Sequence, residues 1–406
     1  MRSPSPSRRS VRDRRLIGVG IVAGAAVGAW VSAQARPRSN EPRTGIIDWV
    51  QAAAIATNLN RGDALSAVER TRLDASYRQL VETCLPIVSD YMEVTIPSPV
   101  GRTFAFDRVD WINANIESFQ RLMAPIEAIG LSVQGGSSIA AYALGGINRT
   151  VVSAEMGLLL GYLAKKVLGQ YDLALLGGES DGGGNLYYVE PNIKMVETSL
   201  NLPSAEFRLW LALHETTHVF EFEGFPWVRP YFQGLLDEYF ELMRSDADVL
   251  RGGVKGLRVL ADRVRSNDND ERSWIEAVMT PEQRGVFDRI QAVMSVVEGY
   301  SNHVMNAVGR DLLKDYDAIA RRFEQRQRQR GIGEQLFARI TGLNLKMEQY
   351  RLGERFVNAV VDERGKSAAL TMWSGPESLP SMIEIRDPSA WMSRVLGTVA
   401  STEAAD

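Results

Sequence analysis

The chain has 406 residues, of which 45% are hydrophobic and 24% charged, and its net charge is −4. Such a composition can bury one large or two modest cores, and it lacks the overall basic charge that is typical of nucleic-acid-binding proteins. The single cysteine, Cys84, excludes an internal disulfide and stands among apolar neighbours. We therefore expect Cys84 to be a small core residue.

Residues 1–35 predict a targeting segment. Arginines are frequent up to residue 15, and residues 16–35 are mostly apolar and carry no charge. This order is typical of a signal peptide or of an N-terminal membrane anchor, and both alternatives stay open; an ordinary flexible soluble tail is the third. In either of the first two cases the arginines remain in the cytoplasm, which predicts an extracytoplasmic protein, secreted or held at the membrane. Residues 36–45, with two prolines, form the expected linker.

Residues 46–145 are expected to form an N-terminal helical subdomain. Apolar periodicity predicts helices over residues 48–58 and 64–83. A further helix is predicted over residues 111–128, after a Pro-Val-Gly turn.

We place a metal-binding domain at residues 146–365 and a C-terminal extension at residues 366–406. Within the metal-binding domain, residues 150–169 predict an apolar helix. Residues 185–190, Asn-Leu-Tyr-Tyr-Val-Glu, give the clearest strand of the chain. The glycines of residues 177–184 lack the Lys-Ser/Thr of a phosphate-binding loop, so we expect a turn there.

The motif that carries chemistry is His-Glu-Thr-Thr-His at residues 214–218, in a chain with three histidines in all. Histidines four apart share one face of a helix and can bind the same Zn²⁺, and the intervening glutamate reaches the zinc-bound water. The helix is expected to begin at Ser204, its candidate N-cap. We predict His214 and His218 as zinc ligands and Glu215 as the general base. Two metal-free core histidines are the alternative, which the spacing, the glutamate and the helical context disfavour.

A catalytic zinc needs a third protein ligand from elsewhere in the chain. The three-histidine class is excluded, because its third histidine would stand at Gly224. The better candidate is Glu298, on the apolar face of a helix predicted over residues 281–313. His303 is the rival, but five helical residues place it about 140° around the helix from Glu298. We favour Glu298 as the ligand, and His303 as support behind a ligand or as a donor to the oxyanion; a solvated Glu298 is the remaining alternative.

Short segments on both sides of the motif form an ordered set. They are Gly169-Gln170-Tyr171-Asp172, Glu190-Pro191-Asn192, Phe207-Arg208-Leu209-Trp210, Phe225-Pro226-Trp227, Glu298-Gly299-Tyr300 with His303-Val304-Met305, and Lys346-Met347-Glu348-Gln349-Tyr350 with Gly353 and Phe356. Together with the histidine motif, this set resembles the bacterial zincin-like metallopeptidase type 2 family over most of the chain, from about Ile47 to Gly365.

The resemblance implies a mainly α fold of the α+β class, zincin-like, with a small β-sheet beside the N-terminal helical subdomain. It also implies zinc at His214 and His218, with Glu215 as base and a third ligand in the Glu298 segment. In such a fold the strand at residues 185–190 would lie above the active helix and could pair with an extended substrate. Some family members are associated with deazaflavin-cofactor biosynthesis, but the sequence contains no flavin-binding motif.

The sequence therefore predicts a zinc metallopeptidase that hydrolyses a peptide or protein substrate. His303, Tyr300 and Tyr350 are, in that order, the candidate donors to the oxyanion. One alternative is a non-catalytic zinc-binding structural or interaction protein, which the retained Glu215 disfavours because a structural site has no use for a base. The other is a helical adaptor tethered to the membrane through residues 16–35.

The arginine-rich run at residues 321–330 is the exception in a chain that is acidic overall. We expect a solvated helix face that ends at Gly331, with a basic docking patch as the alternative.

Overall fold

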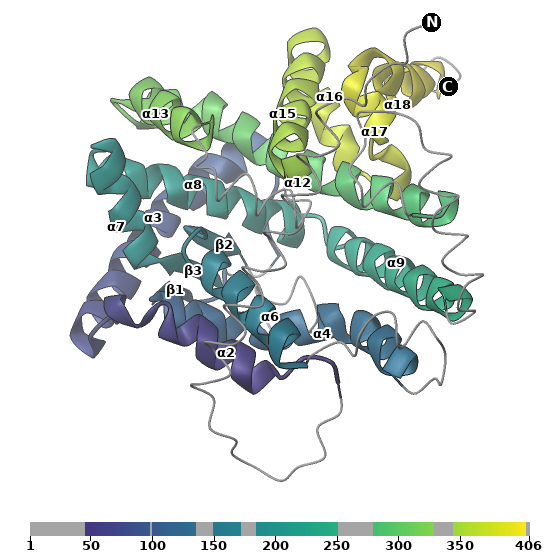
Figure 1. Cartoon of the computed structure of the whole chain (residues 1–406). Helices are drawn as coiled ribbons and strands as arrows, with labels where there is room; N and C mark the ends of the chain where they lie inside the picture. The colour runs from purple at the N-terminus through teal and green to yellow at the C-terminus, as the bar shows by residue number, and fades with distance from the viewer. Residues whose placement is uncertain are drawn as a thin grey trace, which may run out of the picture.

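The computed structural model describes residues 45–97, 100–134, 149–171, 184–250, 279–328 and 344–402. In this part of the chain, helices surround a small three-stranded sheet (Figure 1). The expected mainly α fold with a small β-sheet is confirmed.

The sheet consists of β1 (Thr103–Phe106), β2 (Gly169–Tyr171) and β3 (Leu186–Val189), in the order β1-β3-β2. β1 runs parallel to β3, and β2 runs antiparallel to it. The strand expected at residues 185–190 is thus confirmed as β3. The expectation that this strand pairs with a substrate is wrong, because both of its edges are hydrogen-bonded to other strands. Among the described strands, β2 is the edge strand that lies next to the site.

Two long helices pack against each other at the centre of the molecule, α8 (Ser204–Glu223) and α12 (Pro281–Leu312) (Figure 1). α12 begins with a capping box, in which Thr280 and Gln283 satisfy each other's backbone N–H groups. α8 is buried along most of its length, including most polar residues of the histidine motif. Its N-cap is Pro203 rather than the expected Ser204, whose hydroxyl donates to Glu197 instead.

The other helices enclose this centre. They are α2 (Trp49–Asn58), α3 (Ala67–Met92), α4 (Arg108–Gln134), α6 (Arg149–Leu163), α7 (Glu190–Leu200), α9 (Val228–Leu250), α13 (Tyr316–Arg328), α15 (Asn344–Arg364), α16 (Lys366–Leu370), α17 (Met382–Arg386) and α18 (Pro388–Thr402), with short 3-10 turns at Arg61–Asp63, Thr371–Trp373 and Pro376–Ser378.

The helix expected at residues 150–169 is shorter in the structure, because α6 ends at Leu163 and the last predicted residue opens β2. A tertiary contact accounts for the difference. The Asn192 side-chain amide donates to the carbonyl oxygens of Ala164 and Val167, at 2.7 and 2.6 Å. These carbonyls belong to the residues that follow the helix, so the bonds hold the segment between α6 and β2 as the chain turns into the sheet.

The expected boundary at residue 145 does not coincide with a break in packing. β1 belongs to the expected N-terminal subdomain but pairs with β3, and α3 packs against α8 within the main core. The C-terminal residues are not an appendage either: Trp373 and Trp391 are almost fully buried in the same core, and the Trp227 indole donates to the Trp373 carbonyl oxygen. These long-range contacts bring α3, β1 and the C-terminal helices into the main core, whereas α2, α4 and α6 pack around a second apolar cluster.

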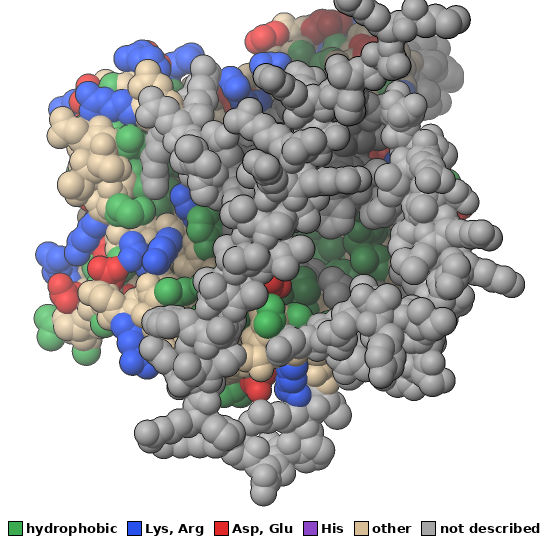
Figure 2. Space-filling model, in the orientation of Figure 1, with side chains coloured by type: hydrophobic (Ala, Val, Ile, Leu, Met, Phe, Trp, Pro, Cys, Tyr) green, Lys and Arg blue, Asp and Glu red, His purple; other side chains and the backbone are tan. Residues whose placement is uncertain are grey.

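No described helix is long and apolar enough to cross a membrane. The expected targeting segment at residues 1–35, most of the linker and residues 177–183 lie outside the described residues. Arg321 and Arg322 are exposed on α13, as expected of a solvated helix face, and the described helix ends at Arg328. Blue side chains predominate at the upper left of Figure 2, where α13 lies, with a few red ones among them.

Candidate metal centre

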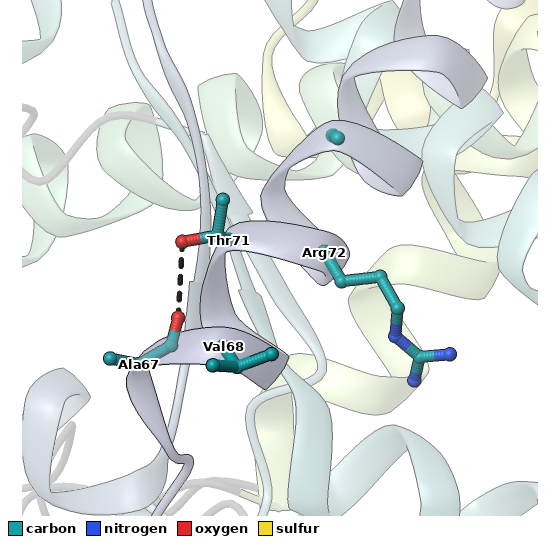
Figure 3. Close-up of a pocket in the computed structure, with 5 residues that line it drawn as sticks. Ala67, Val68, Thr71 and Arg72 are labelled. Atoms are coloured by element: carbon teal, nitrogen blue, oxygen red, sulfur yellow. Dashed lines mark hydrogen bonds between the residues drawn. The ribbon is translucent and has the colours of Figure 1, made fainter.

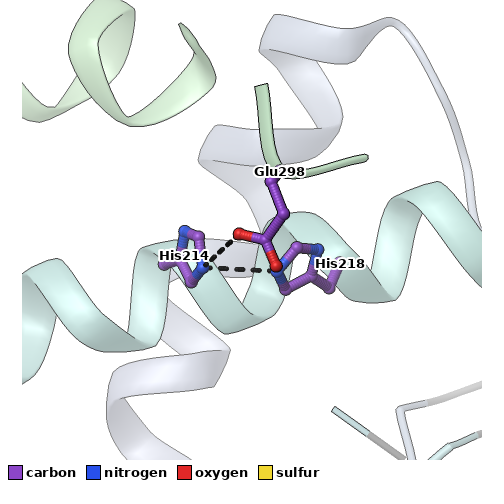
Figure 4. A group of neighbouring side chains, drawn as sticks. All are labelled: His214, His218 and Glu298. Atoms are coloured by element: carbon purple, nitrogen blue, oxygen red, sulfur yellow. Dashed lines mark hydrogen bonds and ion pairs between the residues drawn. The ribbon is translucent and has the colours of Figure 1, made fainter. Parts of the chain in front are cut away.

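α8 and α12 bring His214, His218 and Glu298 together. One ligand atom from each residue lies within 4.8 Å of the other two. Among the described residues, this is the group of side chains that could hold a metal ion. The Nε2 atoms of the two histidines are 3.3 Å apart, and His214 Nε2 is 3.9 Å from Glu298 Oε2. Figure 4 shows Glu298 reaching from α12 toward both imidazoles. The structure thus assembles the three predicted ligands.

This donor set fits zinc. Tetrahedral zinc with Zn–N bonds of about 2.0–2.1 Å holds its nitrogens about 3.3–3.4 Å apart, which matches the separation of the two Nε2 atoms. Two imidazoles and one carboxylate are also a ligand set of catalytic zinc sites, in which a fourth position stays open. The side chains of His214 and Glu298 are 20% and 24% exposed, so the group is accessible from one side and Glu298 is not a freely solvated surface residue.

His218 is held by a buried carboxylate that the sequence analysis missed. His218 Nδ1 lies 2.7 Å from Glu221 Oε2, and the Ser301 hydroxyl donates to Glu221 Oε1 at 3.1 Å. An Nδ1–H that donates to a carboxylate leaves the Nε2 lone pair free for a metal. Burial lowers the pKa of His218, but Glu221, together with Glu298 and Glu215, raises it more, to about 9. Glu221 follows His218 by three residues on the same helix, and this spacing is the sequence signal from which their contact could have been predicted.

His214 has a different environment. Its Nδ1 faces the thioether sulfur of Met305 at 3.1 Å, a weak acceptor. Burial, followed by the nearby His218, lowers the pKa of His214 well below its usual value. The neutral imidazole is the form that binds a metal. The lowered pKa keeps His214 neutral and therefore able to bind one.

Glu215 lies next to this group, between α8 and β2. Its side chain is buried, and the backbone N–H of Tyr171 hydrogen-bonds to it. Burial raises the pKa of Glu215 to about 7, and the Glu298 charge adds to the rise, while His218 and the Tyr171 N–H oppose it. A carboxylate with a pKa near neutrality suits general-base work.

Comparison with known proteins agrees with this geometry. The sequence profile of the zincin-like metallopeptidases matches residues 47–392, which is most of the chain and includes both central helices. The chain belongs to the zincin-like metallopeptidase family. It is also similar to a crystal structure described as "a putative hydrolase with a novel fold" from Chloroflexus aurantiacus, with 43% identity, a TM-score of 0.65, and coverage of 86% of this chain and 98% of that chain. No curated protein matches the chain.

In this zincin-like protein, His303 is not part of the metal group. Its Nε2 lies 2.7 Å from the Tyr91 hydroxyl and its Nδ1 lies 2.6 Å from Asn358 Oδ1, so both ring nitrogens already have partners. The structure therefore favours Glu298 over His303 as the third ligand. A contribution of His303 to the reaction stays a prediction.

The two tyrosines named as further oxyanion donors differ in what the structure describes. Tyr300 is almost fully buried and packs edge-on against Trp373, which is a core environment. Tyr350 lies in α15, and its side chain is outside the described residues.

A pocket on the outer face of α3 has no connection with this chemistry. It is lined by Ala67, Val68, Thr71, Arg72 and Ala75 (Figure 3). The Thr71 hydroxyl donates to the Ala67 carbonyl oxygen of its own helix. None of the metal-group residues lines this pocket.

Proposed function

We propose that this family member is a zinc-dependent metallopeptidase, with zinc held by His214, His218 and Glu298. The observation that carries the proposal is the meeting of these three ligand atoms within 4.8 Å, next to a buried glutamate of the same motif. Family membership supports zinc and hydrolysis as the chemistry. When bound, zinc lowers the pKa of a water molecule from about 16 to about 7 and polarises the carbonyl group of the substrate.

Glu215 is proposed as the general base. Its carboxylate accepts the proton of the attacking water and passes it to the leaving amine, a role that needs a pKa near the working pH. His214 and His218 point their Nε2 atoms at the same position, and Glu221 holds the His218 ring in orientation. His303 is proposed to act from outside the ligand set, through its contacts with Tyr91 and Asn358.

The substrate is proposed to be a peptide or protein in an extended conformation. β2 lies directly against Glu215, so a substrate backbone that runs along this strand would pass next to the proposed base. This assigns to β2 the pairing that the sequence analysis assigned to β3. We further propose that residues 1–35 direct the protein out of the cytoplasm; fractionation of cells that express the full chain tests this part.

Hydrolysis of a defined peptide mixture, followed by mass spectrometry, tests the proposed activity. We expect Glu215→Gln to lower kcat about 100- to 10,000-fold with zinc retained, because only the base is lost. We expect His218→Ala to lose zinc. Glu206→Gln, at the other end of α8, is the matched control and should cleave as the wild type does. Equal cleavage by Glu215→Gln and wild type would contradict the mechanism, and zinc binding without any cleavage by the wild type would favour a non-catalytic zinc protein.

A further inference from the structure

We infer that Gly169 is a positioning residue for Glu215: by having no side chain, it leaves the space on β2 in which the carboxylate of the base lies. The catalytic meaning of this inference rests on the proposed function, whereas the packing relationship between the two residues does not.

The contact between the two residues is very close. A Cβ atom placed on Gly169 would lie 2.3 Å from Glu215 Oε1, 2.6 Å from its Cδ and 2.8 Å from its Cγ. Ordinary contacts begin at 3.4 Å, so the carboxylate would have to move by about 1 Å to admit a methyl group. The whole end of the Glu215 side chain therefore occupies the position of the missing side chain.

The backbone conformation of Gly169 does not itself require glycine. Among the described residues, the glycines with positive φ are Gly45 and Gly365, whereas Gly169 has the extended backbone of a strand. Any L-residue can adopt that conformation, and glycine weakens a strand because it adds conformational entropy to the unfolded chain. The reason for glycine at this position is thus the space that it leaves.

The atoms around the slot give Glu215 little alternative room. Tyr188, on the neighbouring strand β3, is paired with Gly169. The side chains of paired residues in antiparallel strands lie on the same face of the sheet. The Tyr188 ring is fully buried and stacks on Tyr77 with the ring centroids 4.2 Å apart and 2° between the planes. The Tyr77 hydroxyl in turn donates to Glu190, so neither ring can easily move aside.

A hydrogen bond fixes the carboxylate from the strand itself. The Tyr171 backbone N–H, two residues along β2 from Gly169, donates to Glu215. Residues two apart on a strand present their backbone groups to the same edge, so the slot and the donor lie side by side. β2 thereby holds the base by shape at one residue and by a hydrogen bond at the other.

A double-mutant cycle followed by thermal unfolding of the metal-free protein tests the packing without any measurement of activity. We expect Gly169→Ala to lower the Tm by about 2–4 °C in the wild-type background, because the added methyl group displaces a buried carboxylate. In the Glu215→Ala background the same change should leave the Tm unaltered, since the obstructing atoms are gone. An equal loss of Tm in both backgrounds, or failure to fold in both, would overturn the inference, because the glycine would then be needed by the sheet alone.

Gly157→Ala is the matched control for this cycle. Its Cβ would meet Ala52 O at 2.7 Å and Ile55 Cβ at 2.8 Å, where α6 crosses α2, and Glu215 is not among these contacts. We expect it to lower the Tm by the same amount in both backgrounds, because distant sites are additive.

The kinetic test compares the same substitution with and without the base. Gly169→Ala should lower kcat about 100-fold, with KM and zinc content unchanged, because a base displaced by about 1 Å is misaligned with the attacking water. In the Glu215→Gln background, which already lacks the base, the same substitution should lower the residual kcat by no more than about 2-fold. Full activity of Gly169→Ala would overturn the positioning role. If the wild type cleaves no peptide, the proposed function fails. The double-mutant cycle of Tm values still tests whether Glu215 occupies the space at Gly169.

Discussion

The carboxylate of Glu221 lies 2.7 Å from Nδ1 of His218, on the opposite side of the imidazole from the Nε2 atom that faces His214. Glu221 is fully buried, and its other oxygen accepts a hydrogen bond from Ser301 on α12. One carboxylate therefore ties a ligand on α8 to the helix that carries Glu298. This arrangement connects the metal group with the packing of the two central helices.

We predict that Glu221→Ala lowers the zinc affinity about 10- to 100-fold, because His218 loses the partner that orients its ring. Glu221→Gln should have a smaller effect, since an amide oxygen can still accept from Nδ1. Competition with a chromophoric chelator measures the affinity. Glu206→Gln serves as the control on the same helix, and an unchanged affinity in Glu221→Ala would remove the orienting role.

A second prediction separates the two candidates for the third ligand. Glu298→Ala should lose more zinc affinity than Glu221→Ala does, because a ligand is removed rather than its support. His303→Ala should retain zinc and lose about 1–3 kcal/mol of unfolding free energy, because Tyr91 and Asn358 lose a buried partner. Metal analysis and urea titration give both quantities, and the opposite pattern would make His303 the ligand.

Arg208 is expected to be a stability residue rather than part of the metal site. Its guanidinium forms two hydrogen bonds, of 2.8 and 2.9 Å, with the fully buried carboxylate of Glu190. Arg208→Met leaves that carboxylate without its main counter-charge, so the unfolding free energy should fall by about 3 kcal/mol. The double variant Arg208→Met/Glu190→Gln should recover part of the loss, which urea denaturation measures. A loss equal to the sum of the two single losses would show that the pair is not coupled.

Cys84 should be unreactive in the folded protein. It is fully buried, and burial raises the pKa of its thiol to about 12, so the reactive thiolate is absent at pH 8. A thiol reagent should therefore label the protein only after denaturant is added. The unfolded chain ionises this thiol above about pH 9 whereas the folded protein keeps it neutral, so stability should fall as the pH rises from about 9 to 12. Cys84→Ala should weaken this pH dependence, and rapid labelling of the native protein would contradict the burial.

Local sequence patterns determined the parts of this protein that depend on short spacing. Histidines four apart with a glutamate between them lie on one helix face wherever the segment is helical, and the apolar pattern of residues 204–223 ensures that it is. The capping box at Thr280 marks the start of α12 for the same reason. The helical class, the metal-binding pair and the candidate base all follow from contacts within a few residues.

The tertiary structure decided what depends on contacts between distant segments. Helical periodicity made Glu298 and His303 both available as the third ligand, and only the packing of α12 against α8 brings Glu298 to the histidines. The position of β2, rather than β3, at the edge of the sheet has the same origin. Strand order depends on pairing partners that lie far apart in the sequence. The slot at Gly169 is likewise a property of two segments 46 positions apart, since a residue without a side chain shows its purpose only through the atom that occupies its space.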